Sequence, residues 1–241
     1  MAELDLPSGP AELLEAVRKP LGDHLGGEHH LRLGGGTALA ARWGHRHSTD
    51  LHLFVDPEAY ARLYGDPERL RGNIARHTGA VEQFGVGPGY TLIAVPDGEV
   101  IVLTTRSLTP GPVSGDFVRG TRVAIETNAE ILAKKLTHRL SIYHLFVPRD
   151  LYDIAVARHL DPEALDTALA TIPAPNLDDI RKQLGLLGPG WAAGHHEPLL
   201  QPTFPRDAAD SVAVVRRVIG RALGDTNPPP PSPDAPPFRS R

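Results

Sequence analysis

The expected fold is decided by residues 31–54, which read LRLGGGTALAARWGHRHSTDLHLF. An apolar strand ends at three glycines, a short alanine-rich helix begins near Thr37, and a second apolar strand follows over 49–55. Glycine lets a backbone approach an anion closely, and the first turn of a helix offers free N–H groups and a partial positive charge. This order therefore predicts a phosphate-binding turn between two strands.

The second strand presents two side chains that can bind a metal. Successive residues of a strand point to opposite faces of the sheet. Asp50 and His52 therefore share one face, while Leu51 and Leu53 share the other. The pattern predicts that one face meets a metal and that the other seals a hydrophobic core.

Two separate blocks of the sequence follow a known pattern. Gly35-Gly36-Thr37-Ala38-Leu39 is followed by His45-Arg46-x-Ser48-x-Asp50. Further along the chain, Glu130-Ile131-Leu132-Ala133-Lys134-Lys135-Leu136 precedes Arg149-Asp150-Leu151-Tyr152-Asp153-Ile154. Together these blocks resemble the AbiEii/AbiGii-type toxin nucleotidyltransferases.

The resemblance implies an α+β fold with a polymerase-β-like nucleotidyltransferase core, in which helices flank a small mixed sheet, followed by a helical C-terminal region. We expect the core over 1–126 and the helical region over 127–226. The proline-rich end, 227–241, is expected to be disordered, because prolines donate no backbone hydrogen bonds and the segment has few apolar residues.

The resemblance also implies roles for particular residues. The catalytic residues would be Asp50 and Lys135, and the metal ligands Asp50 and His52. The metal would be Mg²⁺ or Mn²⁺, and a nucleoside triphosphate would be the substrate. The residues expected to bind the nucleotide are Gly35, Gly36, Thr37, Arg46, Ser48, Lys135 and Asp153.

Three further expectations concern charged neighbours of these residues. Lys134 and Lys135 lie about 100° apart on a helix, so they cannot both face one ligand. Arg46 is expected to orient Asp50 or a bound phosphate, and His45 to fix its loop by hydrogen bonding. Asp150 is expected to belong to an ion-paired helix start.

The sequence departs from the family pattern at the metal site. His52 stands where the family has the second aspartate of its Asp-x-Asp pair, and the expected neighbouring strand, 99–106, contains Glu99 but no aspartate. Magnesium prefers oxygen ligands, whereas imidazole suits manganese, zinc or nickel better. His52 thus fits either an altered metal site, a phosphate contact or a site that has lost its chemistry.

Composition limits the other classes of function. The 241 residues carry a net charge of −4, so nucleic acid would have to bind through a local basic patch. There is no cysteine, which excludes disulfides and thiol chemistry. No stretch is long and apolar enough to span a bilayer, and we expect a cytoplasmic bacterial protein.

Taken together, the sequence predicts the toxin of a toxin–antitoxin (abortive infection) pair that transfers a nucleotide from a nucleoside triphosphate to an RNA, such as tRNA, or to a protein. A cognate antitoxin would be its partner. Two alternatives stay open. One is a nucleotide- or protein-binding pseudoenzyme of the same fold, and the other is a transferase that modifies small molecules such as antibiotics.

Overall fold

The computed structural model describes residues 3–96, 98–188 and 190–225. Its strands are β1 (Arg32–Gly34), β2 (Leu51–Val55), β3 (Gln83–Gly87), β4 (Tyr90–Val95), β5 (Gly98–Thr104), β6 (Val113–Val118) and β7 (Thr121–Glu126). Its α-helices are α1 (Ser8–Leu25), α2 (Gly35–Trp43), α3 (Pro57–Gly65), α4 (Pro67–Thr78), α5 (Asn128–Lys134), α6 (Pro148–Leu160), α7 (Pro162–Ala170), α8 (Ala174–Leu186), α9 (Pro205–Ala209) and α10 (Ser211–Ala222). A 3₁₀ turn, η1 (Glu28–His30), precedes β1, and a π-helix, η2 (Lys135–Ile142), continues α5.

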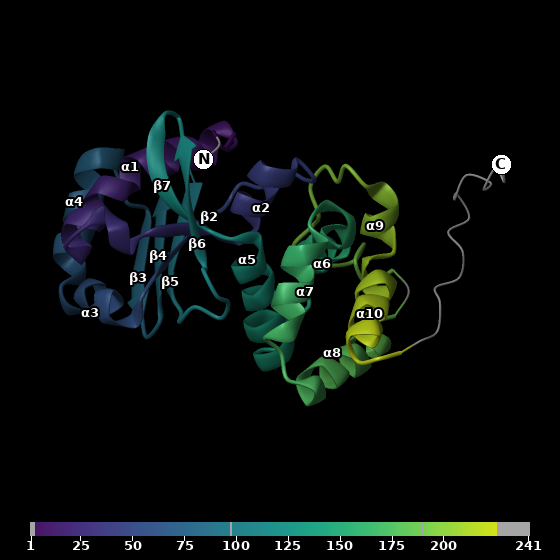
Figure 1. Ribbon diagram of the computed structural model, residues 1–241. Helices are drawn as coiled ribbons and strands as arrows, with labels where there is room; N and C mark the ends of the chain where they lie inside the picture. Colours follow the sequence, from purple (N-terminus) through teal and green to yellow (C-terminus); the bar gives the residue numbers. More distant parts are fainter. Residues whose placement is uncertain (1–2, 97, 189, 226–241) are drawn as a thin grey trace.

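The strands form one mixed sheet in the order β3-β4-β5-β2-β1-β7-β6. β2 lies near its centre, antiparallel to β1 and parallel to β5, so that His52 sits between Gly34 and Ile101. Helices α1, α3 and α4 gather on one side of the sheet, and α5 to α10 gather on the other (Figure 1). The mixed sheet between two groups of helices confirms the predicted fold class.

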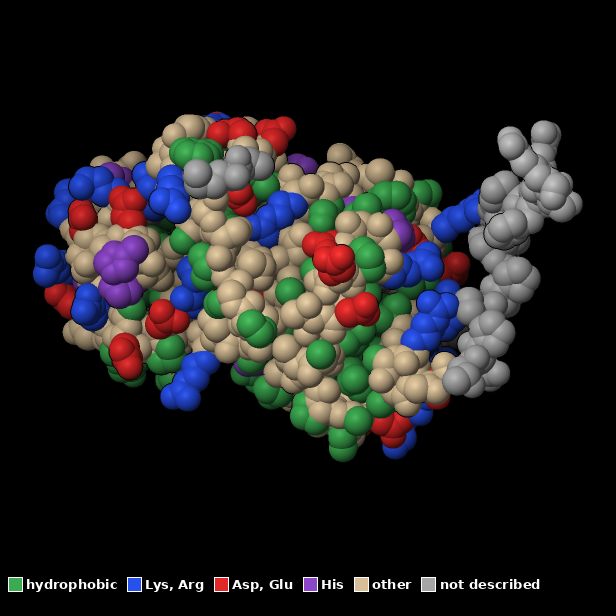
Figure 2. Space-filling view, in the orientation of Figure 1, with side chains coloured by type: hydrophobic (Ala, Val, Ile, Leu, Met, Phe, Trp, Pro, Cys, Tyr) green, Lys and Arg blue, Asp and Glu red, His purple; other side chains and the backbone are tan. Residues whose placement is uncertain are grey.

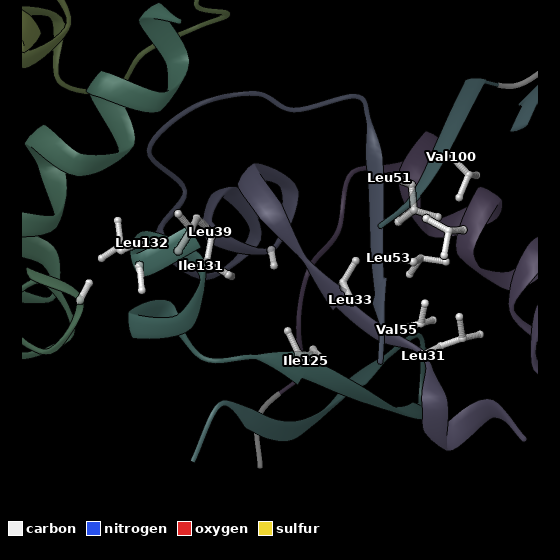
Figure 3. Packing of buried hydrophobic residues seen from close by; sticks show 14 of the residues in the cluster. Leu31, Leu33, Leu39, Leu51, Leu53, Val55, Val100, Ile125, Ile131 and Leu132 are labelled. Carbon is white, nitrogen blue, oxygen red and sulfur yellow. The ribbon is translucent and has the colours of Figure 1, made fainter. Parts of the chain in front are cut away.

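The two faces of β2 differ as the alternation predicts. Leu51 and Leu53 are buried in the hydrophobic core, together with Leu33 of β1 and Val100 of β5 (Figure 3). His52 points to the other face, where it meets Gly35 at the start of α2. The core therefore fixes the strand that carries His52 and leaves its opposite face available to the site.

Helix α1 continues past a proline in its interior. It continues through Pro20 to Leu25 and ends where Gly26 adopts a left-handed conformation with φ of 84°. Val17, Leu21 and Leu25 recur at helical spacing and are fully buried. Their burial outweighs the hydrogen bond that a proline removes from the helix interior.

Two features of the elements differ from what the sequence suggested. Helix α2 begins at Gly35 rather than near Thr37, and no side chain caps it at Gly34. The glycine-containing strands β3 and β6 were not expected, because glycine obscures the alternating pattern. The tail expected to be disordered, 227–241, lies outside the described residues.

The last described strand ends at Glu126, and only helices and loops follow it up to residue 225. Thr127 caps α5 by accepting a hydrogen bond from the backbone N–H of Glu130 at 3.3 Å. Helix α2 packs against α5 and α6, so the sheet and the later helices are in direct contact. The division of the chain at residue 126 into two domains stays a prediction.

Two glycines test the packing around the strand–turn junction. A Cβ on Gly34 would lie 2.7 Å from both Oε2 of Glu126 and the ring of Phe54, whereas a Cβ on Gly72 in α4 would meet nothing within 4 Å. We expect Gly34→Ala to lower the free energy of unfolding by about 1–3 kcal/mol, as overpacking does. Gly72→Ala should instead raise it by up to about 1 kcal/mol, because alanine favours a helix interior. Chemical denaturation measures both, and equal effects of the two substitutions would contradict the packing described.

Candidate functional site

The backbone of the turn between β1 and α2 lies close to the face of the sheet that carries His52. Gly35 adopts a φ of 67°, and a Cβ there would lie 3.0 Å from Cβ of His52. At Gly36 a Cβ would collide with the guanidinium of Arg46. Only glycine fits these two positions, and the first N–H groups of α2 remain without partners inside the helix. The turn therefore leaves backbone N–H groups available to donate to a ligand.

Thr37 and Ser48 form a hydrogen-bonded pair that holds the backbone of Asp50. The two hydroxyls are 2.8 Å apart, and the Thr37 hydroxyl also donates to the backbone carbonyl of Asp50. Both side chains are buried. The Thr37 hydroxyl is therefore engaged within the protein. The group of Thr37 that is left to face a ligand is its backbone N–H, at the first turn of α2.

Asp50 lies just before β2 and is partly open to solvent. Its Oδ2 is 3.1 Å from Nη1 of Arg149, and its Oδ1 accepts from the Thr49 hydroxyl at 3.2 Å. The other guanidinium nitrogen of Arg149, Nη2, is 2.7 Å from Oε2 of Glu197. Arg149 thus joins the candidate metal ligand to a carboxylate from the loop before α9.

His52 is held as a neutral imidazole. Burial, with a smaller contribution from the nearby cations Arg149, Lys135 and Arg139, lowers its pKa from 6.5 to about 4, although Asp50 acts in the opposite direction. At neutral pH its ring nitrogens therefore carry no net charge, which is the state that a metal ligand requires.

Asp153 of α6 is the centre of a buried ion-pair cluster. Its Oδ1 accepts from Nε of Arg46 at 2.6 Å and lies 2.7 Å from Nε2 of His45. Its Oδ2 lies 3.0 Å from both Nη2 of Arg46 and Nζ of Lys135. Burial alone would raise the pKa of Asp153, but Arg46 and Lys135 outweigh it and hold the pKa well below its usual range.

Asp150, one turn earlier on α6, binds two further cations. Its Oδ1 pairs with Lys135 and its Oδ2 with Arg139. Burial would raise the pKa of Asp150, but these two cations together lower it. Lys135 and Arg139 lie one turn apart on η2, which explains why both reach the same carboxylate.

Lys134 points away from this cluster, as the helical spacing predicts. Its Nζ pairs with Glu126 and lies 3.4 Å from Oε1 of Glu130, and it sits 4.0 Å above the centre of the Phe54 ring. The two adjacent lysines therefore serve different carboxylates, and only Lys135 belongs to the candidate site.

The cations of the site fall into a buried set and an accessible set. The side chains of Arg46 and Lys135 are 4% and 8% exposed, whereas those of Arg149 and Arg139 are 28% and 31% exposed. A ligand entering from solvent beside Asp50 and His52 would meet the second set first.

The donors available to a metal are a carboxylate and a neutral imidazole. Asp50 immediately precedes β2 and His52 lies on it, and this mixed pair suits a single ion such as Mn²⁺ better than a pair of Mg²⁺ ions. Ile101 lies beside His52 on the parallel strand β5, a strand that carries Glu99 but no aspartate. Across the described chain, no group of three or more histidine, aspartate and glutamate side chains is arranged to hold a metal.

Comparisons with known proteins bear on this arrangement. The family model described as "Nucleotidyl transferase AbiEii toxin, Type IV TA system" matches residues 21–174. The chain belongs to this family. The match includes the glycine turn, Asp50, Lys135 and Asp153, and ends before Glu197. Among curated proteins, none matches this AbiEii-family chain.

Two solved structures share the fold. One, described as a "putative nucleotidyltransferase from H. pylori", has a TM-score of 0.51 and 20% sequence identity, covering 90% of this chain and 96% of the other. The second, JHP933 from Helicobacter pylori, has a TM-score of 0.51 and 18% identity, covering 91% and 95%. These similarities extend through the helices after residue 174 and support the fold alone.

The structure brings together the residues that the AbiEii pattern singles out, with different pairings from those expected. Arg46 contacts Asp153 rather than Asp50, and Arg149 takes the place beside Asp50. His45 fixes its loop by hydrogen bonding, as predicted. Arg139 was missed, although its position four residues after Lys135 places both on one helix face. No local pattern marks Glu197, because its partner lies 48 residues earlier in the chain.

The low pKa of His52 predicts how this AbiEii-family protein responds to acid. Between pH 6.5 and about 4 the unfolded chain binds a proton that the native His52 does not, so stability falls as the pH falls through this range. We expect the melting temperature of the wild type to drop more between pH 7.5 and pH 5 than that of His52→Gln. Scanning calorimetry with a chelator present measures the difference, and the exposed-residue variant His77→Gln is the control. Equal drops in the wild type and His52→Gln would contradict a buried neutral imidazole.

Proposed function

We propose that this AbiEii-family chain transfers a nucleotide from a nucleoside triphosphate to a hydroxyl of an RNA, such as tRNA, or of a protein. The observation that carries the proposal is the meeting of three family elements at one place. The glycine turn, Asp50 and the Lys135–Asp153 pair come from distant parts of the sequence and surround the start of α2. Their meeting supports a role in binding phosphates.

Each residue has a task in the proposed reaction. Backbone N–H groups of Gly36 and Thr37 bind phosphate oxygens, and Thr37 and Ser48 hold Asp50 in place. The acceptor hydroxyl oxygen bonds to the α-phosphorus, the bond to pyrophosphate breaks, and the hydroxyl proton passes to water. Lys135 stabilises the negative charge that develops on the leaving pyrophosphate.

Asp50 and His52 would hold the metal, either Mn²⁺ or Mg²⁺. When bound, the metal would polarise the α-phosphate and orient the attacking oxygen. His52 is already neutral at physiological pH, so it needs no deprotonation before it binds an ion. Because it supplies nitrogen rather than oxygen, we propose that Mn²⁺ supports the reaction better than Mg²⁺.

Two partners complete the proposal. Membership of a type IV toxin family supports a cognate antitoxin as the protein partner. An RNA acceptor would have to be held by local contacts, because positive and negative side chains are interspersed over the face in Figure 2. None of the described helices could cross a bilayer. We place the action of the protein in the cytoplasm, where nucleoside triphosphates and tRNA are found together.

A second candidate function is nucleotide binding without transfer. The observation that favours it is the absence of an aspartate from β5, together with Arg149 bound to Asp50 where a metal would otherwise approach. In this case the glycine turn and the cations would still bind phosphates, and the protein would act through binding alone.

Transfer assays separate the two candidates. The protein is incubated with each labelled nucleoside triphosphate, total RNA and either Mg²⁺, Mn²⁺ or Zn²⁺, and label in RNA or protein is scored. We expect wild-type transfer with Mn²⁺ to exceed transfer with Mg²⁺, and Asp50→Asn to abolish both. No transfer with any nucleotide or metal would overturn the proposed reaction.

The variant His52→Asp sharpens this test. If His52 serves an altered metal site, the substitution should reduce transfer with Mn²⁺ by about tenfold or more, because a fitted nitrogen ligand is lost. If His52 marks a site that has lost its chemistry, the restored carboxylate pair should raise Mg²⁺ affinity and transfer should increase. Equal activity of the wild type and the variant with Mg²⁺ would contradict both versions.

A further inference from the structure

A segment outside the family-matched residues folds back over the candidate site. We name residues 194–204, between α8 and α9, the strap. The strap's Leu200 carbonyl accepts from the backbone N–H of His47 at 3.0 Å, and the N–H of Thr203 donates to the carbonyl of His45 at 2.8 Å. The N–H of Phe204 donates to the Tyr152 hydroxyl at 3.0 Å. These bonds hold the later part of the strap against the loop that leads to Asp50.

The earlier part of the strap places an acidic side chain beside the site. Glu197 reaches Nη2 of Arg149 at 2.7 Å, while Nη1 of the same guanidinium is 3.1 Å from Asp50. Near Glu197 the strap holds itself by local contacts, in which the Glu197 N–H donates to Nδ1 of His195 at 3.0 Å and His196 lies 3.7 Å from Oε1. Arg149 is therefore the contact through which Glu197 reaches the body of the protein.

This ion pair is open to exchange in a way that the deeper pairs are not. The side chains of Arg149, Asp50 and Glu197 are each between 28% and 35% exposed, although Oε2 of Glu197 is itself covered where it faces Arg149. A Glu197 carboxylate that leaves the guanidinium can therefore reach solvent. Asp153 and Arg46 are buried, and breaking that pair would leave a charge in the interior. Of the two accessible cations, Arg139 is paired with the buried Asp150, so Arg149 is the one whose carboxylate partners are both partly exposed.

A guanidinium that binds two oxygen anions through two nitrogens has the geometry that suits a phosphate. Arg149 already meets this requirement with Asp50 and Glu197, beside the glycine turn and the accessible Arg139. Glu197 occupies the Arg149 nitrogen that points away from Asp50, and so takes the place of one phosphate oxygen.

We propose that Glu197 is an internal anion that holds Arg149 in place until the triphosphate of an incoming nucleotide replaces it. Arg149 then binds the phosphates, and the strap near Glu197 loses its contact with α6. The identity of the ligand as a nucleotide rests on the proposed function. The competition between Glu197 and a triphosphate rests on the geometry of the strap.

Competition between Glu197 and a triphosphate predicts the direction in which the affinity for the triphosphate changes when Glu197 is removed. A residue that merely supported the site would weaken binding when it is removed. A competing anion does the opposite, because the ligand no longer has to displace it. Removing a partly exposed ion pair should change affinity by about two- to fivefold, the range that such pairs contribute.

The test uses inorganic tripolyphosphate as the probe, with a chelator present, and measures its Kd by calorimetry on the full chain. We expect Glu197→Gln to bind about two- to fivefold more tightly than the wild type, and Arg149→Gln about tenfold more weakly. In the Arg149→Gln/Glu197→Gln double variant the gain from Glu197→Gln should vanish. Asp178→Asn is the matched control, because Asp178 and Arg181 are paired at 2.6 Å with similar exposure but lie on α8, and it should leave the Kd unchanged.

The outcomes are distinct. Unchanged or weaker binding by Glu197→Gln would overturn the proposal, and so would an equal gain in the Arg149→Gln background, which would show a general effect of charge. Absence of tripolyphosphate binding by every variant would also overturn it. Should Arg149→Gln prove poorly folded by circular dichroism, Arg149→Lys, which keeps the charge and loses the two-nitrogen contact, takes its place with the same expected direction. Tighter binding by Glu197→Gln without label transfer in the assay above would uphold this proposal and overturn the proposed reaction.

Discussion

The buried carboxylate of Asp153 is the contact on which the arrangement of the site depends. It receives Arg46 and His45 from the loop before β2 and Lys135 from the π-helix after α5. Three segments that lie far apart in the sequence therefore meet at one fully enclosed side chain. An unpaired charge in the protein interior is costly. The ion pairs with Asp153 therefore hold these three segments together.

This buried cluster gives the site a fixed inner layer and an exchangeable outer layer. In the inner layer, Gly36 permits Arg46 to pass close to the start of α2, and Arg46 then reaches Asp153. In the outer layer, the partly exposed Arg149 and Arg139 stand beside Asp50 and His52. A site built this way can bind and release an anion without disturbing the pairs that join the sheet to the helices.

The departures from the family pattern concern the face of the sheet that carries His52. His52 and the absence of an aspartate from β5 are departures on the face proposed to hold a metal, whereas the glycine turn and the Asp153 cluster follow the family pattern. The residues proposed to position phosphates are thus separate in this chain from those proposed to hold a metal.

Much of this layout could be predicted from the sequence, and the remainder depends on contacts between distant residues. The alternation of residues 50–53 correctly placed Leu51 and Leu53 in the core, and helical spacing correctly separated Lys134 from Lys135. Strands β3 and β6 were missed because their glycines weaken the pattern. The partners of Arg46 and Arg149 could not be assigned, because they depend on how α6 and the strap pack against the loop before β2.

The central claim is that the Asp153–Arg46 pair joins the sheet to the helices and so builds the site. A double-mutant cycle of Asp153→Asn and Arg46→Gln, measured by chemical denaturation, tests it most directly. Each single variant should lose about 3–5 kcal/mol of unfolding free energy, as expected when one partner of a buried pair is removed. The double variant should lose clearly less than the sum, with a coupling free energy of about 2 kcal/mol or more. Losses below about 1 kcal/mol, or losses that simply add, would contradict the account.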